Sequence, residues 1–250
     1  MGKRFAVLGD PIVQSLSPKI HSAAYAHLNL DWKYEAFKVA SGELLQFVEN
    51  ESGFAGFSVT MPLKFEAYNL AESLDETAQT TGVVNTLLKT EIGFRGFNTD
   101  IYGISKSIEK VPANSIAVLG SGATARSSIQ AVISSKTEAK VTCYARNESA
   151  KTALQNLFSG SVSVAALEDY SGQEDLTINT IPNVKPVAYQ SLLNTSYGDA
   201  SLGANEISGT EMLVWQALAQ IRIFYLGSAD NELNDEDKII AIMRGSITNS

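Results

Sequence analysis

The chain has 250 residues, of which 44% are hydrophobic and 18% are charged, and its formal net charge is −8. This length and composition exclude a short peptide, a fibre and a disordered chain, and they favour one or two globular domains. The excess of 27 acidic over 19 basic residues opposes binding to nucleic acid.

Cysteine and histidine are scarce in this sequence. The one cysteine, Cys143, cannot form an internal disulfide, which favours a reducing compartment, and we expect a cytoplasmic protein. With only two histidines, His21 and His27, the sequence predicts no metal site and no histidine-based catalytic triad. The most apolar long segment, residues 212–226, is interrupted by three polar residues, so we expect no membrane span.

The first half of the chain alternates between predicted strands and helices. Strands are expected at residues 5–8, 32–39 and 54–60, and helices at residues 17–29, 41–50 and 62–74. Ser17 and Pro18 form a strong helix start, with Ser17 as the cap. A hairpin is expected from residues 83–88 and 94–97, and a helix from residue 101. The alternation predicts a sheet covered by helices, with an antiparallel addition.

The second half restarts the same alternation after a seam at residues 111–114. Strands are expected at residues 115–119, 140–145, 161–165 and 176–181, and helices at residues 123–134, 148–158, 211–225 and 235–243. The first strand, helix and second strand of this half make a β-α-β unit of the length that a dinucleotide-binding fold needs.

A glycine loop joins the first strand of that unit to its helix. It reads Gly120-Ser121-Gly122-Ala123-Thr124-Ala125, the variant in which alanine replaces the third glycine. Such a loop lets backbone approach a pyrophosphate at the helix N-terminus, although an ordinary glycine turn is the alternative. Its position between a strand and a helix favours cofactor binding through Gly120, Ser121, Gly122, Ala123 and Thr124.

Arg146 follows the second strand, where an NAD site usually carries an acidic residue for the ribose. A guanidinium there favours the 2′-phosphate of NADP, because its planar fork matches a phosphate. A solvated surface arginine is the alternative.

Two interpretations are open for each of four polar residues, namely Lys64, Asp100, Ser17 and Gln216. A lysine positioned by a carboxylate could accept an alcohol proton, but spacing alone favours a solvated lysine and a helix N-terminal acid. Ser17 could be a helix cap or, with Ser15, a neutral site for a carboxylate. Gln216 could tether a substrate or be a tolerated polar core residue.

Five motifs together resemble the shikimate dehydrogenase family. In chain order they are Ser-Leu-Ser-Pro-Lys-Ile-His at residues 15–21, Val-Thr-Met-Pro-Leu-Lys at 59–64, Gly-Val-Val-Asn-Thr at 82–86, Gly-Phe-Asn-Thr-Asp at 96–100 and Met-Leu-Val-Trp-Gln-Ala at 212–217. Their order and spacing agree along most of the chain, with the glycine loop between the fourth and the fifth.

The resemblance implies NADP-dependent interconversion of shikimate and 3-dehydroshikimate in the biosynthesis of aromatic amino acids. It implies a catalytic pair of Lys64 and Asp100, with Lys64 exchanging the proton of the substrate hydroxyl. The implied substrate-binding residues are Ser15 and Ser17 for the carboxylate, and Thr60, Asn85, Asp100 and Gln216 for the ring hydroxyls. Beyond the glycine loop and Arg146, the implied cofactor-binding residues are Asn179, Thr180, Ile181 and Gly209.

The fold implied by the resemblance has two α/β domains with the active site in the cleft between them. Residues 1–100 would form a substrate domain with a mixed sheet, residues 101–208 a Rossmann-type NADP domain, and residues 209–250 helices that return to the first domain. We expect a small-molecule substrate, no nucleic-acid or membrane partner, and a monomer or homodimer.

The chain departs from the family pattern at three places. Ser58 stands where the family usually has asparagine, and Ala145-Arg146-Asn147 stands where it usually has Asn-Arg-Thr. The family's segment with a substrate-contacting tyrosine is not recognisable between residues 182 and 209. Tyr189 and Tyr197 remain alternatives for that role.

Three rival functions remain open at this point. The first is a sister enzyme that acts on quinate or on an aminated shikimate analogue. The second is an NADP-binding paralogue without turnover, although a sensor would not need both Lys64 and Asp100. The third is an enzyme of the methylenetetrahydrofolate dehydrogenase type, which would not explain Ser15 and Ser17.

Overall fold

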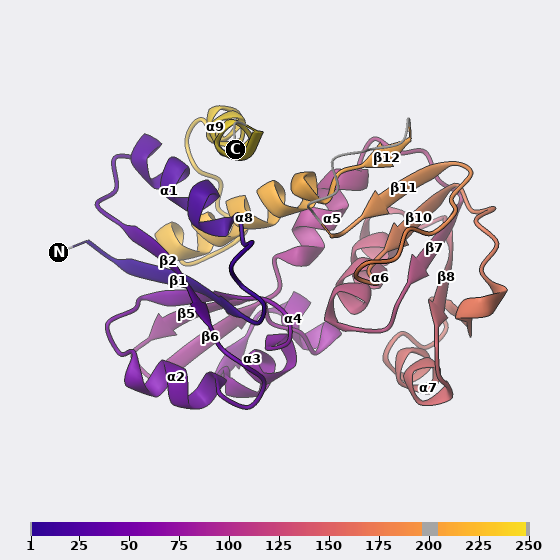
Figure 1. The fold of residues 1–250 in the computed structure, drawn as a ribbon, viewed down its shortest axis with the longest axis horizontal. Coiled ribbons are helices and arrows are strands. Elements are labelled where there is room, and N and C mark those ends of the chain that lie inside the picture. Colours follow the sequence, from indigo (N-terminus) through magenta and orange to yellow (C-terminus); the bar gives the residue numbers. More distant parts are fainter. Residues whose placement is uncertain (1, 197–204, 249–250) are drawn as a thin grey trace. The chain divides into compact units, whose positions relative to one another are not determined.

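The computed structural model describes residues 2–196 and 205–248. The chain divides into two compact units, a first unit of Met1–Thr99 with Val214–Ser250 and a second unit of Asp100–Leu213 (Figure 1). Each unit contains a six-stranded sheet. The predicted α/β fold class with two sheets is therefore confirmed.

The sheet of the first unit is mixed. Its strand order is β2-β1-β3-β5-β6-β4, with β1 parallel to β2 and β3, and with β5 antiparallel to β3 and β6. The predicted hairpin is thus β5–β6. The elements are β1 (Arg4–Gly9), α1 (Ser17–His27), β2 (Lys33–Lys38), α2 (Leu44–Asn50), β3 (Gly56–Val59), α3 (Lys64–Leu70), β4 (Ser73–Leu74), α4 (Glu76–Thr81), β5 (Thr86–Thr90), β6 (Gly93–Phe97), most of α8 (Gly209–Leu226) and α9 (Glu236–Thr248).

Helices cover both faces of this sheet. In Figure 1, α2 and α3 lie below it, and α1 and α8 lie above it. Leu8 and Phe57 from the strands pack with Leu44 and Leu63 on the lower face. On the upper face the rings of Phe5 and Phe224 stack at 4.3 Å between centroids. Strand residues thus alternate between two apolar layers, as the pleat requires.

The cap of helix α1 lies one residue earlier than the sequence predicts. Leu16, not Ser17, occupies the cap position and makes no side-chain cap hydrogen bond. The Ser17 N–H instead donates to Ser15 Oγ at 3.4 Å. The prediction of Ser17 as the helix cap was therefore wrong, and Ser15 satisfies one of the donors that a helix start leaves open.

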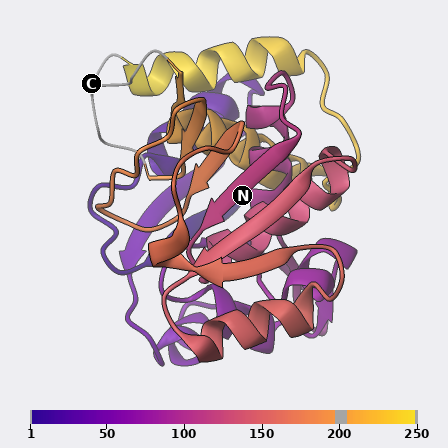
Figure 2. The same ribbon diagram turned by 90° about the vertical axis from the view of Figure 1, so that its right-hand side faces the viewer.

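The second unit is built on a parallel sheet of order β12-β11-β10-β7-β8-β9. In Figure 2 these strands, coloured magenta to orange, lie side by side. The elements are α5 (Asp100–Ile108), β7 (Ser115–Leu119), α6 (Ala123–Ser135), β8 (Lys140–Ala145), α7 (Glu148–Leu157), β9 (Ser163–Ala166), the 3₁₀ turn η1 (Leu167–Asp169), β10 (Leu176–Asn179), β11 (Ser191–Asn194), β12 (Glu206–Ile207) and the start of α8.

The two faces of the second sheet are covered differently. Ile116 and Val118 belong to a large apolar cluster with residues of α5, α6 and α7. On the other face Leu119 and Tyr144 pack against Tyr170 in a smaller cluster that also includes Leu167 of η1. The main core of this unit therefore lies under the helices.

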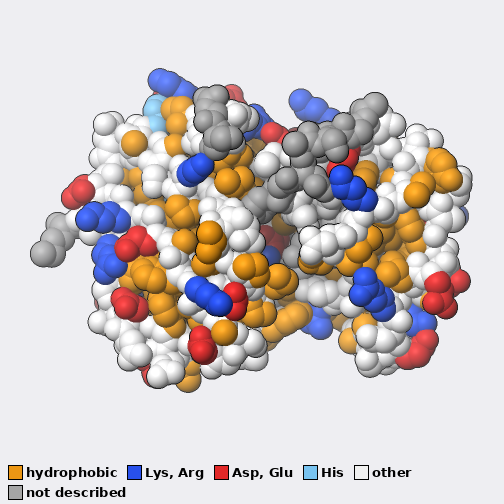
Figure 3. Space-filling model, in the orientation of Figure 1, with side chains coloured by type: hydrophobic (Ala, Val, Ile, Leu, Met, Phe, Trp, Pro, Cys, Tyr) orange, Lys and Arg blue, Asp and Glu red, His pale blue; other side chains and the backbone are white. Residues whose placement is uncertain are grey.

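Charged side chains of both signs are interspersed with hydrophobic ones on the face shown in Figure 3. Neither sign dominates that face. Among the described residues, no helix combines the length and the hydropathy needed to cross a membrane.

Candidate functional site

The topology of the first sheet brings three of the predicted substrate-binding residues to one edge. Parallel β1 and β3 both end there, and antiparallel β5 begins there. Ser15 and Ser17 follow β1, Thr60 and Lys64 follow β3, and Asn85 precedes β5. Thr60, Lys64 and Asn85 thus lie at this edge, and Ser15 and Ser17 lie in the segment that follows β1.

Backbone hydrogen bonds tie these loops together. The Thr60 N–H donates to Leu8 O at 2.9 Å. The Val84 N–H donates to Lys64 O at 3.1 Å, which holds the start of α3 beside the segment that carries Asn85. The position of Lys64 is therefore fixed by the loop that precedes β5.

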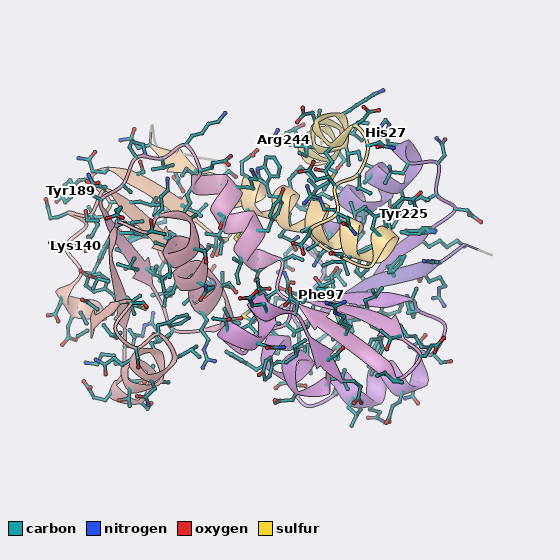
Figure 4. The ribbon with its side chains drawn as sticks, turned by 180° about the vertical axis from the view of Figure 1, so that it is seen from behind. His27, Phe97, Lys140, Tyr189, Tyr225 and Arg244 are labelled. Atoms are coloured by element: carbon teal, nitrogen blue, oxygen red, sulfur yellow. The ribbon has the colours of Figure 1, made fainter. Side chains whose placement is uncertain are left out.

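Asn85, Thr99 and Gln216 meet in the interior of the first unit, where they are 2%, 3% and 7% exposed. Asn85 Nδ2 donates to Thr99 Oγ1 at 3.0 Å, and Asn85 Oδ1 accepts from the Thr99 N–H at 2.9 Å. Thr99 Oγ1 donates to Gln216 Oε1 at 3.3 Å. Figure 4 labels Phe97, which ends β6 just before this group. The structure brings Asn85 and Gln216 together through Thr99, a residue that sequence reasoning missed although it precedes Asp100 in the fourth motif.

A second polar layer lies next to Asn85 and consists of Tyr34, Ser58, His21 and Gln220. Tyr34 OH donates to Ser58 Oγ at 2.6 Å, and Ser58 Oγ donates to Gln220 Oε1 at 2.9 Å. His21 Nε2 lies 3.2 Å from the same oxygen, and the His21 ring stacks on Tyr34 at 4.0 Å between centroids. Burial lowers the pKa of His21 to about 3, against the opposing effect of its hydrogen bond to Gln220. His21 is therefore a neutral imidazole at physiological pH.

Asp100 opens the second unit as the first residue of α5 and is 4% exposed. A carboxylate in the first turn is stabilised by the unpaired N–H groups of a helix start. The local reason for an acid at this position is therefore independent of any catalytic role.

The glycine loop of the second unit has the geometry of a phosphate-binding turn. Gly120 has a φ of +117°, and a Cβ on it would lie 2.4 Å from Thr180 Oγ1, so no other residue fits. Gly122 caps α6, and a Cβ there would meet nothing within 4 Å. The space beside Gly122 is therefore open, and a helix N-terminus at this point offers N–H groups that suit a pyrophosphate.

Strand ends bring other predicted cofactor residues to the edge where this loop lies. Parallel β8 and β10 flank β7, and the exposed Arg146 follows β8 while Thr180 and Ile181 follow β10. The Thr180 N–H donates to Leu119 O at 3.0 Å. A helix N-terminus, an open glycine and an exposed guanidinium on one edge fit a dinucleotide that carries a further phosphate.

Contacts within the fold explain why asparagine stands at position 179 and glycine at position 209. Asn179 is fully buried, donates from Nδ2 to Val184 O at 2.8 Å and accepts at Oδ1 from the Ile181 N–H at 3.1 Å. It therefore shapes the loop after β10 from inside. Gly209 begins α8, and a Cβ on it would lie 2.6 Å from Asn194 O, so this position requires a residue without a side chain.

Of the two alternative tyrosines, the structure describes Tyr189 and not Tyr197. Tyr189, labelled in Figure 4, is 63% exposed, and its N–H donates to Gly172 O at 3.2 Å. Tyr197 lies outside the described residues. Within residues 2–196 and 205–248, no group of three or more His, Cys, Asp or Glu is arranged to hold a metal ion.

Comparisons with known proteins agree with one another. A family model for the shikimate dehydrogenase substrate binding domain matches residues 7–87. The shikimate dehydrogenase (NADP(+)) of Nitrosopumilus maritimus is 32% identical over 213 residues, which cover 82% of this chain and 77% of that protein.

Solved structures resemble the chain over nearly its whole length. The crystal structure of Mycobacterium tuberculosis shikimate dehydrogenase has a TM-score of 0.81 and 29% identity, covering 97% of this chain and 99% of that one. Shikimate 5-dehydrogenase from Thermus thermophilus, in complex with NADP(H) and shikimate, has a TM-score of 0.81 and 25% identity, covering 98% and 100%. The resemblance seen in the five motifs is confirmed, and the chain belongs to the shikimate dehydrogenase family.

Proposed function

We propose that this protein is an NADP-dependent shikimate dehydrogenase that interconverts shikimate and 3-dehydroshikimate in the biosynthesis of chorismate and the aromatic amino acids. The observation that carries this proposal is the buried group of Asn85, Thr99 and Gln216 at the edge that also holds Lys64. Neutral amides and hydroxyls of this kind suit a polyhydroxylated ring, because each can donate to or accept from a hydroxyl.

The substrate-binding roles follow from the chemistry of each side chain. Ser15 and Ser17 at the start of α1 suit the substrate carboxylate, since hydroxyls beside helix N–H groups stabilise an anion without a cation. Thr60, Asn85 and Gln216 suit the ring hydroxyls. The first unit supplies all five of these residues, and we assign substrate binding to residues 1–100 with the helices of residues 209–250.

Lys64 and Asp100 are the proposed catalytic pair. When shikimate is oxidised, the alcohol carbon loses a hydride and the hydroxyl oxygen loses a proton. The Lys64 amine takes that proton and returns it in the reverse direction, which a positioned lysine can do as general base and acid. The carboxylate of Asp100 is assigned to orient the Lys64 amine and to accept from a ring hydroxyl.

Residues 101–208, which make up most of the second unit, are the proposed NADP-binding domain. When bound, NADP supplies the hydride acceptor for this oxidation. Gly120, Ser121, Gly122, Ala123 and Thr124 hold its pyrophosphate, and Arg146 pairs with the 2′-phosphate. Thr180, Ile181 and Gly209 lie on the nicotinamide side, and Asn179 supports their loop. These assignments are supported by the open N-terminus of α6 and the exposure of Arg146.

The test is NADPH formation measured by absorbance with purified protein, NADP and shikimate. Parallel reactions contain quinate in place of shikimate and NAD in place of NADP. We expect saturable reduction of NADP with shikimate and much weaker reduction in the other reactions. A folded protein that binds NADP but gives no signal with any alcohol would contradict the proposal, and preferential turnover of quinate would assign the sister activity instead.

We further propose a cytoplasmic protein that works as a monomer or homodimer. The support for a reducing compartment is that the one cysteine of the sequence, Cys143, is buried and forms no disulfide. Light scattering during size-exclusion chromatography distinguishes the two oligomeric states from a trimer or a larger assembly.

A further inference from the structure

Gln220 lies at the centre of the polar layer next to Asn85. It is 2% exposed and makes four hydrogen bonds. Its Oε1 accepts from Ser58 Oγ at 2.9 Å and from His21 Nε2 at 3.2 Å. Its Nε2 donates to Thr86 Oγ1 at 3.0 Å and to Asn85 O at 3.3 Å. A carboxamide has two acceptor positions and two donor hydrogens, so every position of this side chain is used.

These contacts allow one orientation of the Gln220 amide. The backbone carbonyl of Asn85 can only accept, so the nitrogen of Gln220 must face it and the oxygen must face His21. His21 Nε2 therefore carries the hydrogen, and Nδ1 accepts from Tyr25 OH at 3.2 Å. Since His21 is fully buried, this neutral form persists. The Asn85 carbonyl thus fixes the orientation of Gln220, and the Nε2–H form of His21 is the one that fits it.

The fixed amide reaches the side chain of Asn85 through Thr86. Thr86 Oγ1 accepts from Gln220 and has its own hydrogen left to donate to Asn85 Oδ1, at 2.9 Å. Gln220 therefore contacts Asn85 directly at its backbone carbonyl and, through Thr86, at its side-chain oxygen. An isolated asparagine could turn its amide over at little cost, whereas here a turned amide would place a nitrogen against Thr86 Oγ1 and against the Thr99 N–H, which also donates to Asn85 Oδ1 at 2.9 Å.

We propose that Gln220 is a positioning residue for substrate binding, which with His21 and Thr86 fixes the orientation in which Asn85 holds a ring hydroxyl. The inference rests on the proposed role of Asn85 in substrate binding. Gln216 lies one helical turn earlier on α8, so one helix supplies a direct substrate contact and the support for another.

The first test compares steady-state kinetics of Gln220→Leu, Thr86→Val and Thr86→Ser with the wild type. Gln220→Leu removes the whole carboxamide, and we expect the KM for shikimate to rise about tenfold or more, since a charge-free hydrogen bond is worth roughly one factor of ten. The lost interaction stabilises the bound substrate and the transition state equally. The value of kcat should therefore fall less than about threefold, and the KM for NADP should stay unchanged. Thr86→Val should raise the KM for shikimate several-fold, and Thr86→Ser, which keeps the hydroxyl, should restore it.

The matched control is Leu44→Ala, which truncates a fully buried core residue of the same unit that is absent from the polar layer. It lowers the stability of the fold without touching Asn85, and its KM for shikimate should match the wild type. A folded Gln220→Leu protein with a KM for shikimate within about twofold of the wild type overturns the proposal. If Gln220→Leu does not fold, equal KM values for Thr86→Val and Thr86→Ser overturn it.

A second measurement does not depend on turnover. In ¹⁵N-resolved spectra, Gln220→Leu should move the side-chain NH₂ signals of Asn85 and the imidazole signals of His21, and Leu44→Ala should leave both in place. Because the chain has two histidines, a His27→Gln background leaves His21 as the one imidazole to observe. Unmoved Asn85 signals in Gln220→Leu contradict the positioning role. A wild type that gives no shikimate turnover contradicts the proposed function, and the spectra still decide the positioning role.

Discussion

At the scale of single residues, Lys64 carries the chemical step of the proposed reaction. Lys64→Ala should lower kcat by about 10²–10⁴, the usual contribution of a general base, while the KM for shikimate changes little. The matched control is Lys89→Ala, because Lys89 is an exposed lysine of the same unit whose amine donates to Ser52 O. Near-normal kcat in Lys64→Ala would remove the assigned mechanism.

Arg146 is the residue proposed to select NADP over NAD. Arg146→Ala should raise the KM for NADP about 10- to 100-fold, because a charge-assisted contact to phosphate contributes roughly 1.5–3 kcal/mol. The KM for NAD should change little. Lys140, labelled in Figure 4, begins the same strand that Arg146 follows, so Lys140→Ala is a control at the opposite end of β8. An equal effect of Arg146→Ala on both cofactors would refute the phosphate contact.

At the scale of elements, an ion pair between a buried arginine and a partly buried glutamate joins α8 to α9. Arg222 is 4% exposed, donates from Nε to Glu236 Oε1 at 2.6 Å, and donates from Nη1 to Ala229 O at 3.0 Å. Glu236→Ala would leave a buried guanidinium without its carboxylate and should lower the free energy of unfolding by about 3–5 kcal/mol. Urea titration measures this change.

The control for that prediction is Glu232→Ala. Glu232 lies 3.8 Å from Arg222, but its side chain is 79% exposed. An exposed partner contributes about 0–1 kcal/mol, so the urea midpoint should move little. Equal shifts in the two variants would show that Glu236 is not the stabilising partner.

Elements with strong local signals were predictable from the sequence. The strand Ser115–Leu119 is a short apolar run closed by glycine, and Glu148–Leu157 follows the capping residue Asn147, whose Oδ1 accepts from the Ala150 N–H at 2.9 Å. By contrast, residues 62–74 were predicted as one helix. The chain leaves that helix after Leu70 and forms β4, because Ser73 and Leu74 pair with β6. That pairing is tertiary, and no local pattern encodes it.

The candidate site also contains some residues that could be identified from the sequence and others that could not. Residues in recognisable motifs, such as Lys64 and Asn85, could be named from the sequence. Gln220 could not, since it reaches Ser58 across 162 positions of the chain and reads locally as a polar residue on an apolar helix. Its partner Ser58 gave a signal only as a departure from the family pattern.

At the scale of the whole molecule, the proposed assignments divide the two ligands between the two units. A ligand present at 100 times its dissociation constant stabilises the structure that binds it by about 2.7 kcal/mol. NADP alone should therefore slow hydrogen exchange of the most protected amides in α6 by up to about 100-fold, and shikimate alone should do so for β3 and β5. Mass spectrometry of peptides resolves these segments. Shikimate that protects α6 but leaves β3 and β5 unchanged would contradict the assignment.

The division of the chain also sets the order in which the units can be completed during synthesis. The second unit is one continuous stretch, Asp100–Leu213, whereas the first needs residues from Val214 onwards. Until α8 leaves the ribosome, Phe5 lacks the ring of Phe224, and Ser58 and Asn85 lack the amide of Gln220. The sheet that is made first is therefore the one whose core closes last, and in the interval its upper face is a surface that a chaperone can recognise.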